Sequence, residues 1–118
     1  MIEYKLGEVE MKFADIIWEN EPLSSGQLVK LCEDKLQWKK STTYTILRRV
    51  CERGLFKNED GIVTSNVSKR EFLSNKSEQF VEETFQGSLP SFIAAFTSNR
   101  KLSDEEVEEL RKIIERSK

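Results

Sequence analysis

Trp38-Lys-Lys-Ser-Thr-Thr-Tyr-Thr-Ile-Leu-Arg-Arg-Val-Cys-Glu-Arg-Gly54 is the stretch that decides the fold, because it reads as one helix with two chemically different faces. If Ser41 is the N-cap, helical spacing aligns apolar residues on one stripe, and Gly54 ends the helix in a left-handed conformation. Hydroxyl and guanidinium groups occupy the remaining surface. We therefore expect one face to pack and the other to stay open. The stripe consists of Ile46, Leu47, Val50 and Cys51.

The polar face of this expected helix is suited to DNA. Threonine hydroxyls bond base edges or phosphates, arginine binds guanine through two hydrogen bonds, and a helix N-terminus attracts phosphate. An ordinary solvated helix face has a similar composition, so the surrounding sequence must decide between the two interpretations. The candidate DNA-binding residues are Lys39, Lys40, Ser41, Thr42, Tyr44, Thr45, Arg48 and Arg49.

Basic residues are concentrated around this helix in a chain that is acidic overall. The 118 residues include 19 Lys and Arg against 21 Asp and Glu, which gives a net charge of −2. Residues 35–57 hold seven of the basic residues and a single acid, Glu52. A local basic patch releases counterions from DNA and anchors phosphates regardless of base sequence. The charge pattern therefore favours the DNA interpretation.

Composition excludes several other classes of protein. With 37% hydrophobic and 34% charged residues, the chain is expected to hold one modest core. No apolar run approaches the roughly 20 residues of a membrane span, and the start has no signal-peptide pattern. The expected location is the cytoplasm. Cys32 and Cys51 are expected to be small buried hydrophobic residues rather than a disulfide.

Enzymatic and metal-binding functions find little support in the residues. The chain has no His, no Cys-x-x-Cys or Cys-x-Cys pair and no Gly-rich phosphate loop. Neither Cys has a His partner for nucleophilic catalysis, and most carboxylates lie on charged helical faces. We expect no enzymatic activity, no cofactor and no metal site.

Two more helices precede the central one. After Leu6-Gly7, an apolar stripe at helical spacing predicts a first helix that ends before Pro22. Ser24-Ser25-Gly26-Gln27 predicts a capping box, with Leu23 and Leu28 as its hydrophobic staple, so a second helix should run to about Asp34. The stripe of the first helix consists of Val9, Phe13, Ile16 and Ile17.

A small hairpin is expected after Gly54. Leu55-Phe56 can enter a strand, residues 58–61 (Asn-Glu-Asp-Gly) signal a turn, and Ile62-Val63-Thr64 is a second β-prone run. Three helices followed by a hairpin describe a winged helix-turn-helix. Its third helix would be the one that reads the major groove.

The second half of the chain is predicted to be helical, with Ser68, Ser88 and Ser103 as helix starts. The fold class is thus mainly α: a winged-helix DNA-binding domain over residues 1–68 and a helical dimerisation region over residues 69–118. Folding of the second half back onto the first is the alternative to dimerisation. The candidate dimerisation residues are Phe72, Phe80, Val81, Phe85, Leu89, Phe92, Phe96, Leu110, Ile113 and Ile114.

Several of these segments together resemble one bacterial family. They are Leu6-Gly-Glu-Val-Glu10, Ile16-Ile-Trp18, Ser41-Thr-Thr-Tyr-Thr-Ile-Leu-Arg-Arg49, Glu52-Arg-Gly-Leu55, Ser68-Lys-Arg-Glu-Phe72, Phe85-Gln-Gly-Ser-Leu89 and Leu102-Ser103. The combination is similar to the signature of the penicillinase repressor and methicillin-resistance regulator (BlaI/MecI) family of winged-helix proteins. The likeness extends over nearly the whole chain.

The resemblance implies a homodimeric repressor of β-lactamase or related resistance genes, with operator DNA and a second copy of the chain as partners. It implies DNA contacts from Ser41, Thr42, Thr45 and Arg49, whereas Lys39, Lys40, Tyr44 and Arg48 are candidates from their chemistry. It also implies relief of repression when a membrane-bound sensor metalloprotease cleaves the second half, and the matching bond is Ala95-Phe96.

Two departures from the family pattern affect these expectations. Family wings carry an Arg, a Tyr and a Pro after the turn Gly, and residues 61–66 contain none of them, so we assign no DNA contact to the wing. Ala95 stands where characterised members have Asn. Copper-responsive relatives carry C-terminal Cys-x-Cys pairs, which are absent here.

Two functions remain as alternatives to repression: a winged-helix protein-interaction module that does not bind DNA, and a DNA-binding activator.

Overall fold

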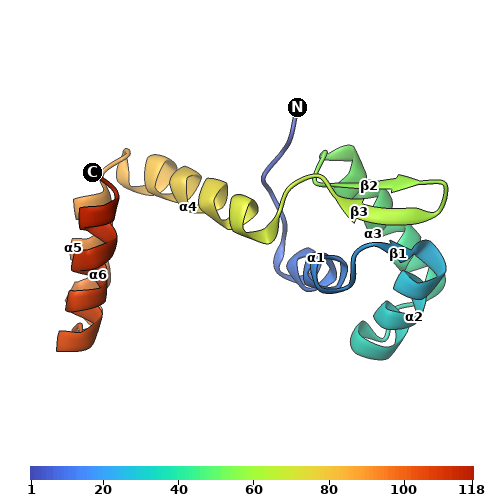
Figure 1. The fold of residues 1–118 in the computed structure, drawn as a ribbon, viewed down its shortest axis with the longest axis horizontal. Helices are drawn as coiled ribbons and strands as arrows, with labels where there is room; N and C mark the ends of the chain where they lie inside the picture. The colour runs from blue at the N-terminus through green and yellow to red at the C-terminus, as the bar shows by residue number, and fades with distance from the viewer. The chain divides into compact units, whose positions relative to one another are not determined.

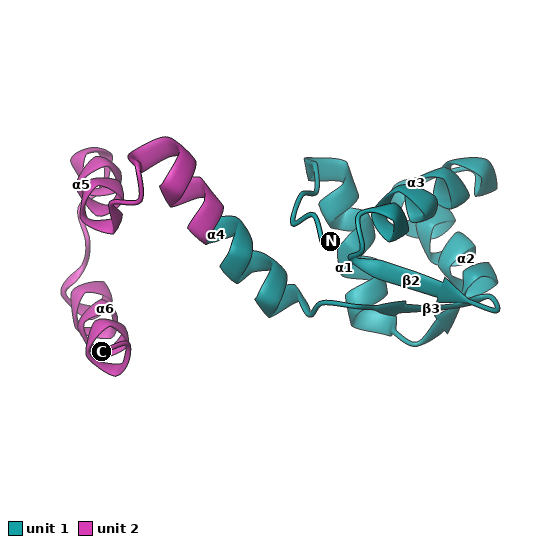
Figure 2. Ribbon diagram, turned by 90° about the horizontal axis from the view of Figure 1, so that it is seen from above, with its two compact units in different colours: residues 1–77 teal, residues 78–118 magenta.

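The computed structural model describes residues 1–118 and divides into two units, Met1–Ser77 and Glu78–Lys118 (Figures 1 and 2). The first unit contains three helices, a small antiparallel sheet and the start of a fourth helix; the rest of the chain is helical. The elements are α1 (Glu8–Asn20), β1 (Leu23–Ser24), α2 (Ser25–Leu36), α3 (Lys40–Glu52), β2 (Phe56–Glu59), β3 (Ile62–Ser65), α4 (Lys69–Phe85), α5 (Leu89–Asn99) and α6 (Asp104–Arg116). The mainly α, winged-helix prediction is confirmed.

Capping side chains start α2 as the sequence predicts. The hydroxyl of Ser24 accepts a 3.1 Å hydrogen bond from the amide of Gln27, and the Gln27 side chain accepts a 2.8 Å bond from the amide of Ser24. This reciprocal pair satisfies two amide groups that have no partner within the helix. Leu23 and Leu28, the predicted staple, are both buried. The capping box fixes the start of the helix-turn-helix.

The start of α3 differs from the prediction. The N-cap is Lys39, with no capping side chain, and Ser41 lies inside the first turn. Just before it, Trp38 stacks on Phe13 of α1 with ring centroids 5.5 Å apart, so tertiary packing determines where the chain turns into the helix.

The C-terminal end of α3 agrees with the prediction: Gly54 has a φ of +80°. A Cβ there would lie 3.3 Å from Ile2, so glycine suits this position on both counts.

The sheet has strand order β1-β3-β2 with both pairings antiparallel. The hairpin turn consists of Asp60 and Gly61 alone, with φ values of 53° and 82°. Two central residues with positive φ are what a type I′ hairpin turn requires. The turn is therefore shorter than expected, since Asn58 and Glu59 belong to β2. The third strand, β1, was not predicted.

The core of the first unit lies between the three helices and the sheet. Phe13, Phe56 and Val63 are at most 1% exposed, and Cys32 is buried as expected. Val9 is the exception within the predicted stripe of α1, because 53% of its surface remains exposed. It lies in the first turn of α1, whereas Phe13, Ile16 and Ile17 reach the core.

Phe72 corrects an assignment made from spacing. It was expected at a dimer interface, but it is completely buried among the core residues of the first unit. Its ring centroid lies 5.8 Å from that of Trp18. A side chain enclosed in this way offers no surface to a second chain. The boundary between the two units correspondingly falls inside α4, at Ser77.

The three predicted helix starts in the second half are confirmed. The Ser68 hydroxyl accepts from the amide of Glu71 at 3.0 Å, and Ser88 caps α5 in the same way. Ser103 and Glu106 form a complete capping box at the start of α6. No helix of the chain has the length and apolar character needed to span a membrane.

Candidate nucleic-acid interface

Helix α3 presents a polar outer face because its inner face is held by the core. Thr43, Leu47 and Val50 are buried at helical spacing. On the opposite side, helical geometry places Ser41, Thr45, Arg48 and Glu52 in one row, with Thr42 and Arg49 on one flank and Tyr44 on the other. Of the candidate DNA-binding residues, all are exposed except Thr45, which is half-buried. The structure thus brings them together along one helix.

Short-range contacts orient two of these side chains. The Thr45 hydroxyl donates a 2.9 Å hydrogen bond to the Ser41 carbonyl, which leaves its lone pairs free to accept. The Tyr44 hydroxyl donates to the Ser25 hydroxyl at 3.3 Å, and the Lys40 ammonium lies 6.0 Å from the Tyr44 ring centroid. Tyr44 therefore connects the start of α2 to the outer face of α3.

Only part of the basic patch is available to a ligand. Arg53 forms a 2.8 Å ion pair with Glu10 and donates to the Lys5 carbonyl at 3.1 Å. Lys57 lies 3.5 Å from Glu59 on the same strand. Four basic residues of the face form no ion pair within the chain: Lys39, Lys40, Arg48 and Arg49.

The role of Arg53 is structural, and the sequence holds no local signal for it because Glu10 lies far away along the chain. The Arg53 hydrogen bond keeps the pKa of the Glu10 carboxyl below its usual range, and burial opposes this effect. The pair joins the end of α3 to the start of α1. Arg49, on the neighbouring flank, makes a smaller contribution to the same lowering of the Glu10 pKa.

Acidic side chains border the outer face on two sides. Glu52 lies in the outer row at the last turn of α3, and Glu59 and Asp60 are exposed at the tip of the hairpin. Negative charges at these positions repel phosphate. The favourable surface is therefore the part of α3 from Lys39 to Arg49, which includes the positive end of the helix dipole.

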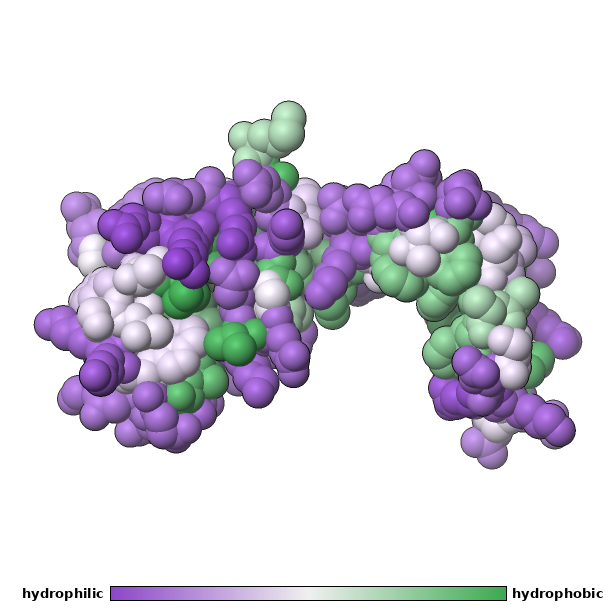
Figure 3. Space-filling model, turned by 180° about the vertical axis from the view of Figure 1, so that it is seen from behind, coloured by the Kyte–Doolittle hydropathy of each residue, from purple (hydrophilic) through white to green (hydrophobic).

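The second unit carries the candidate dimerisation residues other than Phe72, and much of its surface is apolar. None of its residues is fully buried, and hydrophobic side chains gather on the face seen in Figure 3. Phe80, Phe85 and Phe92 form an edge-to-face cluster with centroids 5.5–5.9 Å apart. The most exposed large apolar residues are Phe80, Leu89, Ile93, Phe96, Val107, Ile113 and Ile114.

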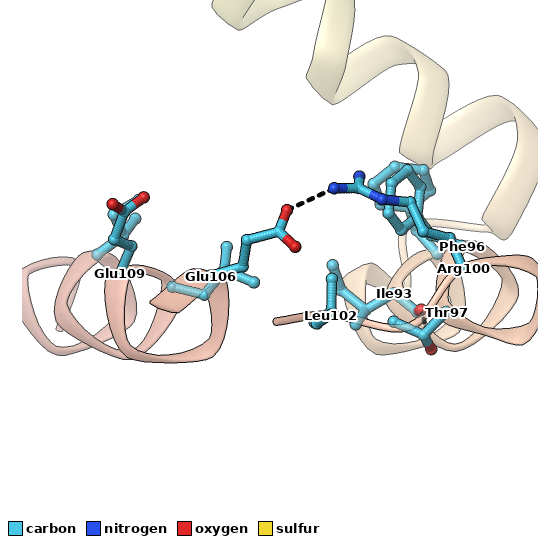
Figure 4. A pocket seen from close by; sticks show the side chains of 10 residues that line it. Ile93, Phe96, Thr97, Arg100, Leu102, Glu106 and Glu109 are labelled. Atoms are coloured by element: carbon cyan, nitrogen blue, oxygen red, sulfur yellow. Dashed lines mark hydrogen bonds and ion pairs between the residues drawn. The ribbon is translucent and has the colours of Figure 1, made fainter. Parts of the chain in front are cut away.

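A groove of about 290 Å³ lies between α5 and α6 (Figure 4). Ile93, Phe96 and Leu102 contribute apolar side chains to it, and Arg100 forms a 2.7 Å ion pair with Glu106 across the two helices. The guanidinium of Arg100 also lies 5.4 Å from the Phe96 ring centroid.

Ala95 and Phe96, the candidate cleavage bond, are both exposed on α5. No cluster of His, Cys, Asp and Glu in the chain could hold a metal ion.

Residues 6–116 match the model of the family described as penicillinase repressor. The chain belongs to this family. The penicillinase repressor of Bacillus licheniformis is 26% identical over 118 residues, which cover 97% of this chain and 92% of the relative. The methicillin resistance regulatory protein MecI of Staphylococcus aureus strain Mu50 is 25% identical over 115 residues, or 94% of each chain. The family is one of transcriptional repressors and not of enzymes.

The winged-helix fold has a solved counterpart. The solution structure of the DNA-binding domain of the repressor BlaI aligns with a TM-score of 0.54 at 18% identity, over 60% of this chain and 93% of that domain. At this identity the match supports the fold alone. Its extent fits the first unit, which contains α3 and its outer face.

Proposed function

We propose that this penicillinase repressor family member is a homodimeric transcriptional repressor that binds a pseudo-palindromic operator. Each protomer inserts α3 into a major groove. Ser41 and Thr42 face the DNA at the start of the helix, and Lys39 and Lys40 bind phosphates. The observation that carries this proposal is the outer face of α3, where four basic residues without an ion pair surround a row of hydroxyls.

Thr45 is the residue we assign to base recognition. Because the Thr45 hydroxyl donates to Ser41, it can only accept from a base edge, and the amino groups of adenine and cytosine are the donors in the major groove. Arg48 forms no ion pair within the chain, and we assign its guanidinium to a phosphate. We assign Tyr44, whose hydroxyl donates to the Ser25 hydroxyl, to the flank of the same major groove.

Selection of binding sites from random duplex DNA at about 0.15 M salt tests this function. We expect an enriched inverted repeat whose half-sites lie about one helical turn, or a multiple of it, apart. Ser41→Ala and Arg48→Ala should weaken binding, whereas the control Glu33→Gln, which removes one negative charge from the exposed surface of α2, should not weaken it. No enrichment from folded protein would support a protein-interaction module instead.

Dimerisation through the second unit is supported by its lack of a core. Helices that bury no side chain of their own leave apolar surface that a second copy can cover. Ile113 and Ile114 on α6 and Phe96 on α5 are each at least 42% exposed. Because operators with twofold symmetry are bound by twofold dimers, the same surface would hold two reading helices together.

Sedimentation equilibrium tests the dimer with a matched pair of substitutions. Ile113→Glu on α6 should shift the protein towards monomer at least tenfold in dissociation constant. Val9→Glu is the control, because Val9 is equally exposed, at 53% against 51%, but lies in the first unit. Equal effects from both substitutions would contradict the assignment of the interface to the second unit.

Relief of repression by cleavage of Ala95-Phe96 completes the proposal, with a membrane-bound sensor metalloprotease as partner. Both side chains are exposed, but the bond lies within α5, so this helix must unwind locally before a protease can cut it. Cutting α5 would separate Phe92 from α6 and weaken the dimer. Two half-sites would then bind independently and lose their effective-concentration advantage. Incubation with the purified sensor protease, followed by mass spectrometry of the fragments, tests the position of the bond.

A further inference from the structure

The Ala95-Phe96 bond lies well inside α5, which runs from Leu89 to Asn99. Cleavage of such a bond requires local opening of the helix, and its rate follows the population of the opened form when opening and closing are fast. Contacts that hold the turn around Phe96 therefore set the rate of cleavage. Helices α5 and α6 both belong to the second unit, so contacts between them act within one compact body.

The Phe96 ring is held by residues one turn before it and one turn after it, although 42% of its surface is exposed. Its centroid lies 6.2 Å from the ring centroid of Phe92. The guanidinium of Arg100 lies 5.4 Å from the Phe96 centroid, a distance at which a cation is attracted to an aromatic ring. Unwinding of this turn has to pull the ring away from both neighbours.

Arg100 also connects the end of α5 to the beginning of α6. It is the residue that ends α5, and its guanidinium lies 2.7 Å from one carboxylate oxygen of Glu106 (Figure 4). The other oxygen of Glu106 accepts a 3.1 Å hydrogen bond from the Ser103 amide in the capping box of α6. One carboxylate thus caps α6 and binds the residue that ends α5.

Helix α5 has little else to keep it wound at this point. None of its side chains is buried, and a helix of 11 residues is marginal without outside contacts. The Ser98 hydroxyl donates a 2.7 Å hydrogen bond to the Ala95 carbonyl, and the Thr97 hydroxyl donates to the Ile93 carbonyl at 2.8 Å. Such bonds from side chains to the preceding turn slightly weaken a helix. The contacts of Arg100 therefore carry unusual weight.

We propose that Arg100 is a latch: by binding Phe96 and Glu106 together, it keeps α5 wound at the Ala95-Phe96 bond and limits the rate of cleavage there. The inference rests on the proposed function, because it concerns the regulation of the proposed cleavage. Arg100 is a positioning residue, since it acts on the bond through Phe96 and the first turn of α6. Opening of α5 is thereby coupled to loss of the contact with α6.

Arg100→Gln opens the latch, and Arg111→Gln is the matched control. Both substitutions remove one positive charge from an exposed arginine of the second unit. Arg111 pairs at 3.9 Å with Glu108 of its own helix, so its loss breaks no ion pair between α5 and α6. Thermolysin is the probe, because it cuts before large apolar side chains such as Phe. Mass spectrometry follows the rate of cleavage at Ala95-Phe96, and sedimentation equilibrium reports the association state of the same samples.

We expect a moderate acceleration, because exposed ion pairs and cation–π contacts are individually weak. Arg100→Gln should be cut about fivefold faster than the unaltered protein, and Arg111→Gln within about twofold of it. Arg100→Lys keeps a cation that can reach Glu106 but loses the planar guanidinium over the ring. Its rate should lie between those of the unaltered protein and Arg100→Gln. Amide hydrogen exchange of residues 94–99 should show the same order without any protease.

Equal cleavage rates for Arg100→Gln and Arg111→Gln would overturn the proposal. An acceleration that matches an equal shift towards monomer would also overturn it, because protection would then come from association rather than from the latch. A sensor protease that cuts the chain at another bond would overturn the proposed cleavage instead. The thermolysin rates and the hydrogen exchange would still decide whether Arg100 holds α5 wound.

Discussion

Arg48→Ala gives the sharpest test of the DNA-binding face. Arg48 is exposed on the outer row of α3 and forms no ion pair within the chain. Arg53 lies five positions further along the chain, at the end of the same helix, but its guanidinium is committed to Glu10 and to the Lys5 carbonyl. The two substitutions remove the same formal charge, and the structure predicts different consequences for binding.

The expected magnitude follows from counterion release. Each phosphate neutralised by the protein contributes about −0.9 to the slope of log affinity against log salt concentration. The proposed dimer contains two copies of Arg48, so Arg48→Ala should flatten the slope by about 1.8. Between about 0.05 and 0.2 M salt, the affinity of the unaltered protein should therefore fall about tenfold more than that of the variant.

Fluorescence anisotropy with a labelled operator measures this slope across a salt series, with circular dichroism as the check on folding. Arg53→Ala should lower stability and leave the slope of the folded protein unchanged. If both substitutions flatten the slope equally, the salt dependence reports overall charge rather than a contact from α3. The assignment of Arg48 to the interface would then be refuted.

Three further substitutions address single features of the structure. Thr45→Val should cost about 1–3 kcal/mol of discrimination at one base pair, measured by competition among operator variants; equal losses on all sequences would make Thr45 a positioning residue. Val50→Ala should lower the free energy of unfolding by about 2 kcal/mol in urea titrations, because Val50 is completely buried. A decrease below about 0.5 kcal/mol, which is typical of substitutions at exposed sites, would contradict this packing. Arg53 holds the pKa of Glu10 below 4.5, so the pair stabilises the fold above that pH and its contribution disappears as the pH falls through the lowered pKa. Glu10→Gln should therefore destabilise the protein at pH 7, and this effect should diminish as the pH falls through the lowered pKa; an effect that does not change with pH would argue against the ion pair.

Helix starts were predictable where the signal is local. The capping boxes of Ser24 with Gln27 and of Ser103 with Glu106 need only residues three apart, and both form as expected. The start of α3 was not predictable in this way. There the stacking of Trp38 on Phe13 determines the entry of the chain, and no cap signal in the neighbouring sequence reveals it.

Features that depend on distant partners could not be derived from spacing. Strand β1 exists because Leu23 and Ser24 pair with Val63 and Ile62, and a run of two residues is too short for a periodic signal. The burial of Phe72 has the same origin. Helical spacing shows that it shares a helix with Phe80 and Phe85, but only the position of Trp18 places it in the core of the first unit.

The candidate DNA-binding residues followed from composition, because hydroxyls and cations on one helix are visible in the sequence. Their availability was not visible. The basic stretch of residues 35–57 includes Arg53 and Lys57, and both are paired with carboxylates. Counting charges therefore overestimates the surface that phosphate can use, and the assignment of the individual contacts stays a prediction.

The lack of any buried side chain in residues 78–118 has a consequence for concentration. Helices without a core gain most of their stability from what covers them, so we expect the folding of this unit to be coupled by mass action to association. Diluted chains would then expose backbone near α5 that proteases can reach, whereas concentrated chains would protect it. The amount of protein in the cell would in this way govern its own lifetime as well as the occupancy of its operator.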